Sequence, residues 1–196
     1  RHNAMSMEMQ LAVPQILDAF EADDEVRVVV IRGAGEKAFI SGADISEFET
    51  KRSGEEATNL YNEAGGRAIA SFAKLDKPLI AMIQGFCMGG GLATALQADL
   101  RIASEESQFA IPAARLGIGY GYAGVRDLVT LVGPAYASEI LFSARRFSAE
   151  EALRIGLINR VVEKRDLEQT VRELARSIAE NAPLSVRTAK AAIRQA

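Results

Sequence analysis

Three consecutive glycines, Gly89 to Gly91, stand between a short apolar run and a run of good helix formers. The apolar run, Leu79 to Ile83, is bounded by Pro78 and Gly85, which predicts a buried strand, and residues 92–97 predict a helix. Glycines at such a junction let another molecule approach closely, and they leave unpaired amide N–H groups at the positive end of the helix. The junction therefore suits a phosphate, a carboxylate or an oxygen that becomes negative during a reaction. A tight turn packed on a neighbouring strand is the other interpretation.

A second glycine-containing junction has the sequence SGAD, from Ser41 to Asp44. Two backbone amides, one from each junction, would form an oxyanion hole if they converged on one oxygen atom. A third glycine-rich stretch, Gly119 to Gly124, matches the G-x-G-x-x-G pattern of dinucleotide-binding loops, and Glu139 follows about twenty residues later. The residues PAARL separate this stretch from its nearest predicted strand, and Glu139 lies in a predicted helix. A nicotinamide or flavin site is therefore not favoured.

Length and composition exclude several classes of protein. The chain has 196 residues, 48% of them hydrophobic, a formal net charge of −3 and a pI near 5.4, which is typical of one globular domain. Mild acidity without a basic stripe argues against a nucleic-acid partner, and the apolar runs are too short to span a membrane. One cysteine, Cys87, and one histidine, His2, exclude a disulfide framework and a Cys/His metal cluster. With no visible signal peptide, we expect a cytoplasmic protein without a metal.

Apolar periodicity predicts the elements that position these junctions. Ser6 caps a predicted helix that runs to about Asp23, with a kink or restart expected at Pro14. The face of this helix that we expect to be buried consists of Met9, Ala12, Val13, Ile16, Leu17 and Phe20. A β-branched run from Val26 to Ile31 predicts a strand that is buried on both faces. A further amphipathic helix is predicted over residues 57–75.

The second half of the chain continues this alternation of strands and helices. Strands are predicted at 107–111 and 157–162, and helical segments at 112–116, 122–132, 135–143, 149–155, 167–180 and beyond 183. Ser148 and Glu151 have the spacing of a capping box. On the final helix Arg187, Lys190 and Arg194 share one face, which we interpret as solvated, with a site for anionic groups as the less favoured alternative. The whole pattern predicts an α/β domain built from repeated strand–helix units.

Four ordered segments resemble those of one known family. They read FISGADISEF, KPLIAMIQGFCMGGGLATALQADLRIAS, FAIPAARLGI and LFSARRFSAEEALRIGLINRVV. In order and spacing they are similar to the enoyl-CoA hydratase/isomerase family, the crotonases. The resemblance implies an α/β, crotonase-like (ClpP/crotonase) fold, a spiral of ββα units. It also implies a core domain over residues 1–182 whose usual N-terminal strands are absent, the start of a C-terminal helical region at 183–196, and assembly as a homotrimer or a dimer of trimers.

The resemblance further implies that the ligand is an acyl-CoA thioester. Its carbonyl oxygen would accept hydrogen bonds from the amides of Ala43 and Gly90. Coenzyme A would be part of the substrate, so no separate cofactor is implied, and the loop over residues 41–45 would line its adenine and pantetheine side. The other residues implied to bind substrate or CoA are Ser41, Gly42, Asp44, Ile45, Gly89, Ala93, Pro112, Ala113 and Gly117.

The chain departs from the family at the two positions where its hydratases carry catalytic glutamates. By motif position these are Ala93, second after Gly91, and Ala113, directly after Pro112. An alanine cannot activate water or protonate a product, so addition of water across a double bond loses its acid and its base. Tyr120 is the candidate replacement, at a place where the methylmalonyl-CoA decarboxylase branch also has a tyrosine. A packed aromatic side chain in a glycine-rich turn is the alternative for Tyr120.

These observations predict an acyl-CoA-processing enzyme that stabilises a thioester enolate in a backbone oxyanion hole. We favour a lyase reaction of the decarboxylase type, or an isomerisation, because loss of carbon dioxide leaves an enolate directly and requires less from side chains. Three alternatives remain open. They are hydration of an enoyl-CoA, hydrolysis of an acyl-CoA thioester, and binding of acyl-CoA without catalysis.

Overall fold

The computed structural model describes residues 2–43 and 55–196. Its strands are β1 (Val29–Arg32), β2 (Ala38–Ile40), β3 (Leu79–Ile83), β4 (Phe86–Met88), β5 (Leu100–Ser104), β6 (Gln108–Ala110), β7 (Phe147–Ser148) and β8 (Arg160–Val162). Its α-helices are α1 (Met7–Ala22), α3 (Glu55–Lys74), α4 (Gly90–Leu96), α5 (Tyr122–Ser143), α6 (Ala149–Arg154), α7 (Leu167–Ala179) and α8 (Pro183–Gln195). The 3₁₀ helices are η2 (Pro112–Leu116) and η3 (Lys164–Asp166).

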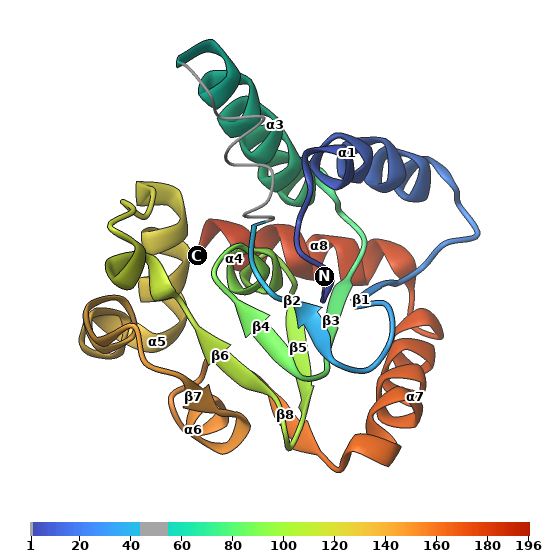
Figure 1. Ribbon diagram of the computed structural model, residues 1–196. Helices are drawn as coiled ribbons and strands as arrows, with labels where there is room; N and C mark the ends of the chain where they lie inside the picture. The colour runs from blue at the N-terminus through green and yellow to red at the C-terminus, as the bar shows by residue number, and fades with distance from the viewer. Residues whose placement is uncertain (1, 44–54) are drawn as a thin grey trace.

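From β1 to β6, consecutive strands enter different sheets, and this produces a spiral. One sheet has the order β1-β3-β5-β8 and is parallel, and the other has the order β2-β4-β6-β7, in which only β7 is antiparallel to its neighbour. A turn of the chain therefore adds one strand to each sheet and then a helix, as β3, β4 and α4 do in the centre of the molecule (Figure 1). The predicted spiral of ββα units is confirmed.

The central strand β3 is buried along its whole length. Successive side chains of a strand point to opposite faces of the sheet. Leu79, Ala81 and Ile83 accordingly belong to the main core cluster, whereas Ile80 and Met82 belong to a second cluster formed with α7. Burial on both faces holds β3 rigidly, and β3 leads through β4 directly into the three glycines.

The strand predictions needed two corrections. β1 is not buried on both faces, because it is the edge strand of the described sheet: Val29 is buried but Val30 is 37% exposed. The sequence also does not predict β4 and β7 as strands, since three and two residues are too few for an apolar alternation to be recognised.

Helix boundaries that were predicted in the second half of the chain are confirmed. Gly133 has φ 74° and ψ 166°, so it divides α5 into two helical parts. Ser148 Oγ accepts a hydrogen bond from the amide of Glu151 at 3.1 Å, and the Glu151 carboxylate accepts one from the amide of Ser148 at 2.9 Å, which is the predicted capping box. Gly156, with φ 79°, follows the end of α6.

Helix α1 differs from its prediction in two ways. It continues through Pro14 as one helix, so the expected restart at this residue is wrong. Its buried residues are Gln10 and Leu17, because the side that packs on α3 is the one that carries Gln10. The side chains that were expected to be buried but are exposed are Met9, Ile16 and Phe20. A polar side chain therefore occupies the most interior position at the start of α1.

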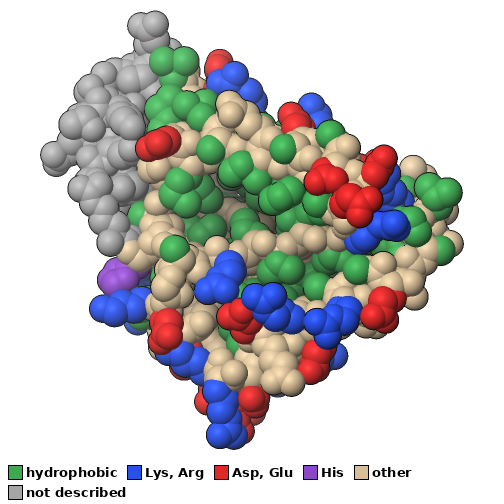
Figure 2. Space-filling model, turned by 90° about the vertical axis from the view of Figure 1, so that its right-hand side faces the viewer, with side chains coloured by type: hydrophobic (Ala, Val, Ile, Leu, Met, Phe, Trp, Pro, Cys, Tyr) green, Lys and Arg blue, Asp and Glu red, His purple; other side chains and the backbone are tan. Residues whose placement is uncertain are grey.

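Charges of both signs are mixed on the surface. Figure 2 shows one face, on which Lys and Arg side chains alternate with Asp and Glu side chains around a hollowed region of hydrophobic side chains. No continuous basic stripe crosses this face. The mixture agrees with the small net charge of −3.

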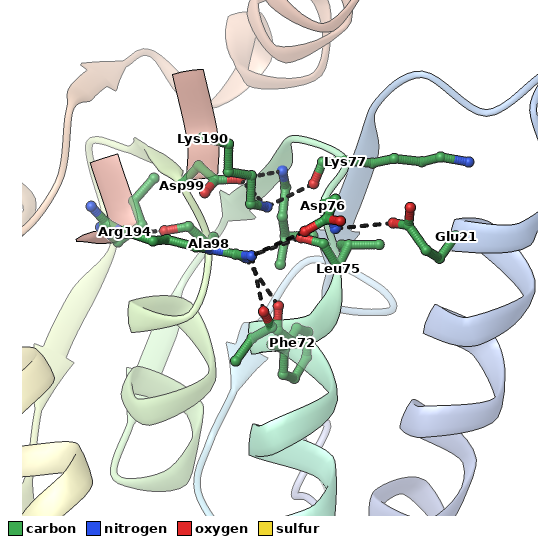
Figure 3. A network of polar contacts seen from close by, with 12 residues as sticks. Glu21, Phe72, Leu75, Asp76, Lys77, Ala98, Asp99, Lys190 and Arg194 are labelled. Atoms are coloured by element: carbon green, nitrogen blue, oxygen red, sulfur yellow. Dashed lines mark hydrogen bonds and ion pairs between the residues drawn. The ribbon is translucent and has the colours of Figure 1, made fainter. Parts of the chain in front are cut away.

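The basic face of α8, formed by Arg187, Lys190 and Arg194, is only partly solvated, so the interpretation as a solvated face holds in part. Lys190 is buried, whereas the side chains of Arg187 and Arg194 are 34% and 31% exposed and pair with Glu21 and Asp76. Arg194 donates hydrogen bonds to the carbonyl oxygens of Phe72 at 3.2 Å and Leu75 at 3.0 Å, at the C-terminal end of α3 (Figure 3). Carbonyl groups at a helix end lack partners within the helix, and a cation satisfies them. The three basic residues therefore attach α8 to the rest of the domain.

Lys190 is the most buried of the three. Its Nζ donates to Asp99 Oδ2 and to the carbonyl oxygen of Lys77, each at 2.7 Å (Figure 3). Asp99 Oδ2 also accepts a hydrogen bond from the amide of Leu79 at 2.7 Å, so this carboxylate connects α8 to the start of β3. Burial lowers the pKa of Lys190, and the Asp99 carboxylate partly offsets that effect.

Replacing Asp99 by alanine should lower the free energy of unfolding by about 2–3 kcal/mol, because Lys190 would keep a buried charge without its carboxylate. The loss should be smaller than for a fully buried pair, since the side chain of Asp99 is 33% exposed and that of Lys190 is 6% exposed. Urea unfolding followed by circular dichroism measures it. Glu168→Ala, which removes an exposed ion pair with Arg172, is the matched control and should cost less than about 0.5 kcal/mol. Equal losses of unfolding free energy in the two variants would contradict the conclusion that the Lys190–Asp99 pair stabilises the fold more than an exposed ion pair does.

Candidate active site

The structure requires or permits glycine for a different reason at each of the three positions at the start of α4. Gly89 has φ 52°, a conformation that side-chain-bearing residues rarely adopt. A Cβ atom on Gly91 would lie 2.2 Å from the carbonyl oxygen of Ile40, so this glycine permits close packing of α4 on β2. A Cβ on Gly90 would meet nothing closer than 3.9 Å, and the nearest atom would be the backbone nitrogen of Ala43. Gly89 and Gly91 thus shape a tight turn, and Gly90 faces the other junction.

Ala43 follows β2 in the SGAD junction. Gly42 has φ 120°, and its carbonyl oxygen accepts a hydrogen bond from the amide of Met5 at 2.8 Å, which ties the junction to the start of the chain. Within residues 2–43 and 55–196, no atom accepts a hydrogen bond from the amide of Ala43 or of Gly90. The fold therefore brings together two backbone amides whose N–H groups are unpaired in this part of the chain.

Two pockets meet at Ala43 and Gly90, and both residues line each of them. The first, the Tyr120 pocket, has a volume of about 200 Å³. Its other walls include Ser41, Gly42, Ile111, Pro112, Ala113 and Tyr120. The second, the Gln10 pocket, has a volume of about 240 Å³. Its other walls include Gln10, Val13, Gly65, Phe72, Ala93 and Thr94. A carbonyl group between the two amides would have space for a substituent on either side.

Tyr120 is largely buried in its pocket. Its ring packs on Gly124, where a Cβ atom would lie 2.7 Å from ring atom Cε1, and this contact gives the last glycine of the G-x-G-x-x-G pattern a packing role. Burial raises the pKa of Tyr120 to about 12, with smaller contributions from Cys87 and Asp127. Its hydroxyl is buried and has no hydrogen-bond partner among the described residues. At neutral pH Tyr120 is therefore a neutral phenol with an unused donor.

The sequence-predicted residues divide between the two pockets. Those that line the Tyr120 pocket are Ser41, Gly42, Ala43, Gly89, Gly90, Pro112, Ala113 and Tyr120. Ala93 lines the Gln10 pocket. Gly117 lines neither: its φ of 64° ends η2, and it is exposed. Asp44 and Ile45 lie outside the described residues.

Neither pocket has a charged side chain or a histidine among its described lining residues. Ala93 and Ala113 are the positions at which the resemblance implies glutamates in the hydratases, and each lines one of the two pockets that Gly90 also lines. The nearby Cys87 is buried, which raises the pKa of its thiol and keeps it protonated. Over residues 2–43 and 55–196 there is no cluster of three or more potential metal ligands, and no helix is long and apolar enough to cross a membrane.

The sequence does not predict the Gln10 pocket, apart from Ala93. Its walls come from α1, α3 and α4, and only the packing of these helices brings Gln10 and Gly65 together. The one available signal was a polar residue between the apolar positions of the first helix. The predicted buried face contains Val13 and Leu17, which lie on the same side of the helix as Gln10, but apolar periodicity does not include a polar residue in such a face.

Comparison with known sequences gives consistent matches. A family model described as enoyl-CoA hydratase/isomerase matches residues 1–196. A short-chain-enoyl-CoA hydratase from Clostridium acetobutylicum is 39% identical over 191 residues, which are 97% of this chain and 72% of that protein. A carnitinyl-CoA dehydratase from Salmonella typhi is 38% identical over 188 residues, which are 96% of this chain and 71% of that protein.

Comparison with solved structures shows that the fold is similar to that of proteins from the same family. An enoyl-CoA hydratase/carnithine racemase from Magnetospirillum magneticum has a TM-score of 0.95 and 36% identity, over 100% of this chain and 73% of its own. A putative enoyl-CoA hydratase/isomerase family protein from Hyphomonas neptunium has a TM-score of 0.95 and 39% identity, over 99% of this chain and 74% of its own. Sequence and fold are thus similar to one group of proteins.

Proposed function

The chain belongs to the enoyl-CoA hydratase/isomerase family, and we propose that it processes an acyl-CoA thioester through an enolate bound by the amides of Ala43 and Gly90. Coenzyme A is part of the substrate in this proposal, and no other cofactor is required. We also propose that the protein is cytoplasmic and assembles as a homotrimer or a dimer of trimers, as the family resemblance implies.

One observation supports this function more than any other: Ala43 and Gly90, whose amides have no acceptor among the described residues, lie close together and line both uncharged pockets. When a thioester becomes an enolate, negative charge develops on its carbonyl oxygen. Amide donors that are already in place stabilise that charge without reorganisation, and the uncharged walls of the pockets strengthen the interaction. Removal of one such donor typically costs about 3–4 kcal/mol of transition-state stabilisation.

The reaction that fits the described pockets best is decarboxylation of a malonyl-type thioester. The bond between Cα and the carboxylate carbon breaks, its electron pair moves toward the thioester carbonyl, and carbon dioxide leaves. The resulting enolate then takes up one proton at Cα. This sequence needs no base to start it, and neither pocket has one among its described lining residues. An isomerisation would also pass through an enolate, but it needs a base to remove a proton first, and no described lining residue of either pocket supplies one.

Tyr120 supplies the polar group that this reaction needs. Its raised pKa, about 12, keeps the hydroxyl protonated, so it can donate a hydrogen bond to the substrate carboxylate or a proton to Cα. It cannot act as a base near neutral pH for the same reason. The hydroxyl of Tyr120 has no hydrogen-bond partner among the described residues, so a polar group of the substrate would provide one.

Tyr120→Phe should lower kcat/KM for decarboxylation by at least about tenfold, because a hydrogen bond to a charged group contributes roughly 1.5–3 kcal/mol. The same substitution should leave the thermal unfolding midpoint unchanged or raise it, since it removes a buried hydroxyl without a partner. Steady-state release of carbon dioxide and differential scanning calorimetry measure the two effects. An unchanged rate would remove Tyr120 from the mechanism.

The names of two relatives favour a second candidate, hydration of an enoyl-CoA or the reverse dehydration. Those relatives are named a short-chain-enoyl-CoA hydratase and a carnitinyl-CoA dehydratase. Against this candidate, alanine occupies both glutamate positions, and no described lining residue offers a carboxylate.

Turnover with three classes of thioester tests the proposal. The full-length protein is incubated with malonyl-type, enoyl- and aryl-CoA thioesters, and carbon dioxide, absorbance of the conjugated double bond and free thiol are followed. We expect carbon dioxide from the malonyl-type substrate. Fast loss of the double bond would favour hydration, release of thiol would favour hydrolysis, and tight binding without any turnover would favour a non-catalytic acyl-CoA binder.

A further inference from the structure

Gln10 is a buried polar residue that the mechanism does not use. Only 8% of it is exposed, and its Oε1 accepts no hydrogen bond from any described residue. A buried carbonyl oxygen without a partner is costly, and most such groups in folded proteins are satisfied. Its position in the wall of a pocket indicates where a partner would come from.

Gln10 lines the Gln10 pocket, and its carboxamide lies between two helices. A Cβ atom on Gly65 of α3 would lie 3.7 Å from Oε1, 3.8 Å from Cδ and 3.8 Å from Nε2, so the planar amide lies over the glycine. Apart from Gln10 and Thr94, the named walls of this pocket are apolar or glycine. The hydroxyl of Thr94 already donates to the carbonyl oxygen of Gly90 at 2.9 Å. Gln10 therefore provides the free polar group of this pocket among the described residues.

The same pocket reaches the amides of Ala43 and Gly90. If the thioester oxygen is held there, as in the proposed function, one arm of the substrate can extend from Gly90 toward Gln10. We propose that Gln10 selects an acyl group that carries a hydroxyl, which hydrogen-bonds to its carboxamide. A hydroxyl both donates and accepts, so it fits the carboxamide in either orientation.

Competition with water decides how strong this selection is. A pocket of about 240 Å³ can hold several water molecules in the free protein. An alkyl chain would displace this water and leave the carboxamide unpaired, whereas the hydroxyl of a hydroxyacyl chain would supply a hydrogen bond to it. Sites built to bind a substrate hydroxyl discriminate strongly against analogues that lack it, because their own polar group is then left unsatisfied.

Equilibrium binding of matched thioesters tests the proposal on the full-length protein. The probes are butyryl-CoA and its 2-, 3- and 4-hydroxy derivatives, measured by isothermal titration calorimetry. We expect the best of the three hydroxy derivatives to bind at least tenfold more tightly than butyryl-CoA. In Gln10→Met, which keeps the length of the side chain but removes its hydrogen bonding, that preference should fall below threefold, with butyryl-CoA bound as well as before or better.

Val13→Ala is the matched control, because Val13 lines the same pocket without a polar group, and it should leave the hydroxyl preference unchanged. Gln10→Met should fold, since it replaces an unpartnered buried amide with an apolar group, and thermal unfolding checks this. A preference below threefold in the wild type, or one that survives in Gln10→Met, would overturn the role of Gln10 and leave the proposed function standing. Failure of all four thioesters to bind would instead reject the proposed function itself.

Discussion

Gly90→Pro should reduce kcat/KM for the acyl-CoA reaction by about 100- to 1000-fold, since it removes one of the two amide donors. Gly90 is the first residue of α4, a position where proline is favoured, but Gly89 before it has φ 52° and ψ −115°, outside the extended range preferred before proline. A Cβ atom at Gly90 would find its nearest neighbours at 3.9 Å and 4.0 Å, which is ordinary contact distance. Circular dichroism and thermal unfolding check that the variant is folded before its activity is compared.

Gly90→Ala is the control that separates the amide from the added atoms. Alanine adds the same Cβ as proline but keeps the N–H, so the ratio of the two variants reports the donor. We expect Gly90→Ala to retain at least tenfold more activity than Gly90→Pro. Similar activities in the two variants would mean that the amide of Gly90 does not hold the developing charge.

Installing the two missing glutamates should produce the second large effect. Ala93→Glu combined with Ala113→Glu should raise the rate of crotonyl-CoA hydration at least about 100-fold over the wild type, because positioned acid–base groups each contribute roughly 10²–10⁴-fold. Both alanines line the pockets that meet at Gly90, so new carboxylates there would stand beside the bound thioester. Loss of absorbance of the conjugated thioester measures hydration.

The corresponding double glutamine variant is the control for the glutamates. Glutamine has nearly the same size and hydrogen-bonding capacity, but it does not transfer protons near neutral pH. Its hydration rate should stay near that of the wild type. No gain in the glutamate variant, with crotonyl-CoA still bound, would mean that the two alanines are not the reason for the proposed loss of hydration.

The parts of the candidate site that could be predicted from the sequence are those encoded by a few neighbouring residues. Gly89 to Gly91 mark a strand–helix junction because backbone conformation and close packing demand glycine there. The SGAD junction and the capping box of α6 are similarly local. That the two junctions lie together was predicted only from the resemblance to the family, because their sequences are far apart along the chain.

The parts that could not be predicted depend on packing between distant segments. Gln10 is buried because α1 rests on α3 with that side inward; apolar periodicity identified Val13 and Leu17 on this side but passes over a polar residue such as Gln10. Lys190 is buried because Asp99, far away in the sequence, accepts its hydrogen bond. A basic residue on an amphipathic helix gives no local sign of such a partner, so its solvation was misjudged.

The stretching frequency of a bound thioester carbonyl tests the convergence of the two amides most directly. Butyryl-CoA labelled with ¹³C at its carbonyl is bound to the protein, and its C=O band is isolated by difference infrared spectroscopy. Two amide donors on one oxygen should move the band below its frequency in buffer, and Gly90→Pro should reverse much of that shift while Gly90→Ala retains it. A band at the buffer frequency in the wild-type complex would contradict the proposal that Ala43 and Gly90 hold the thioester oxygen.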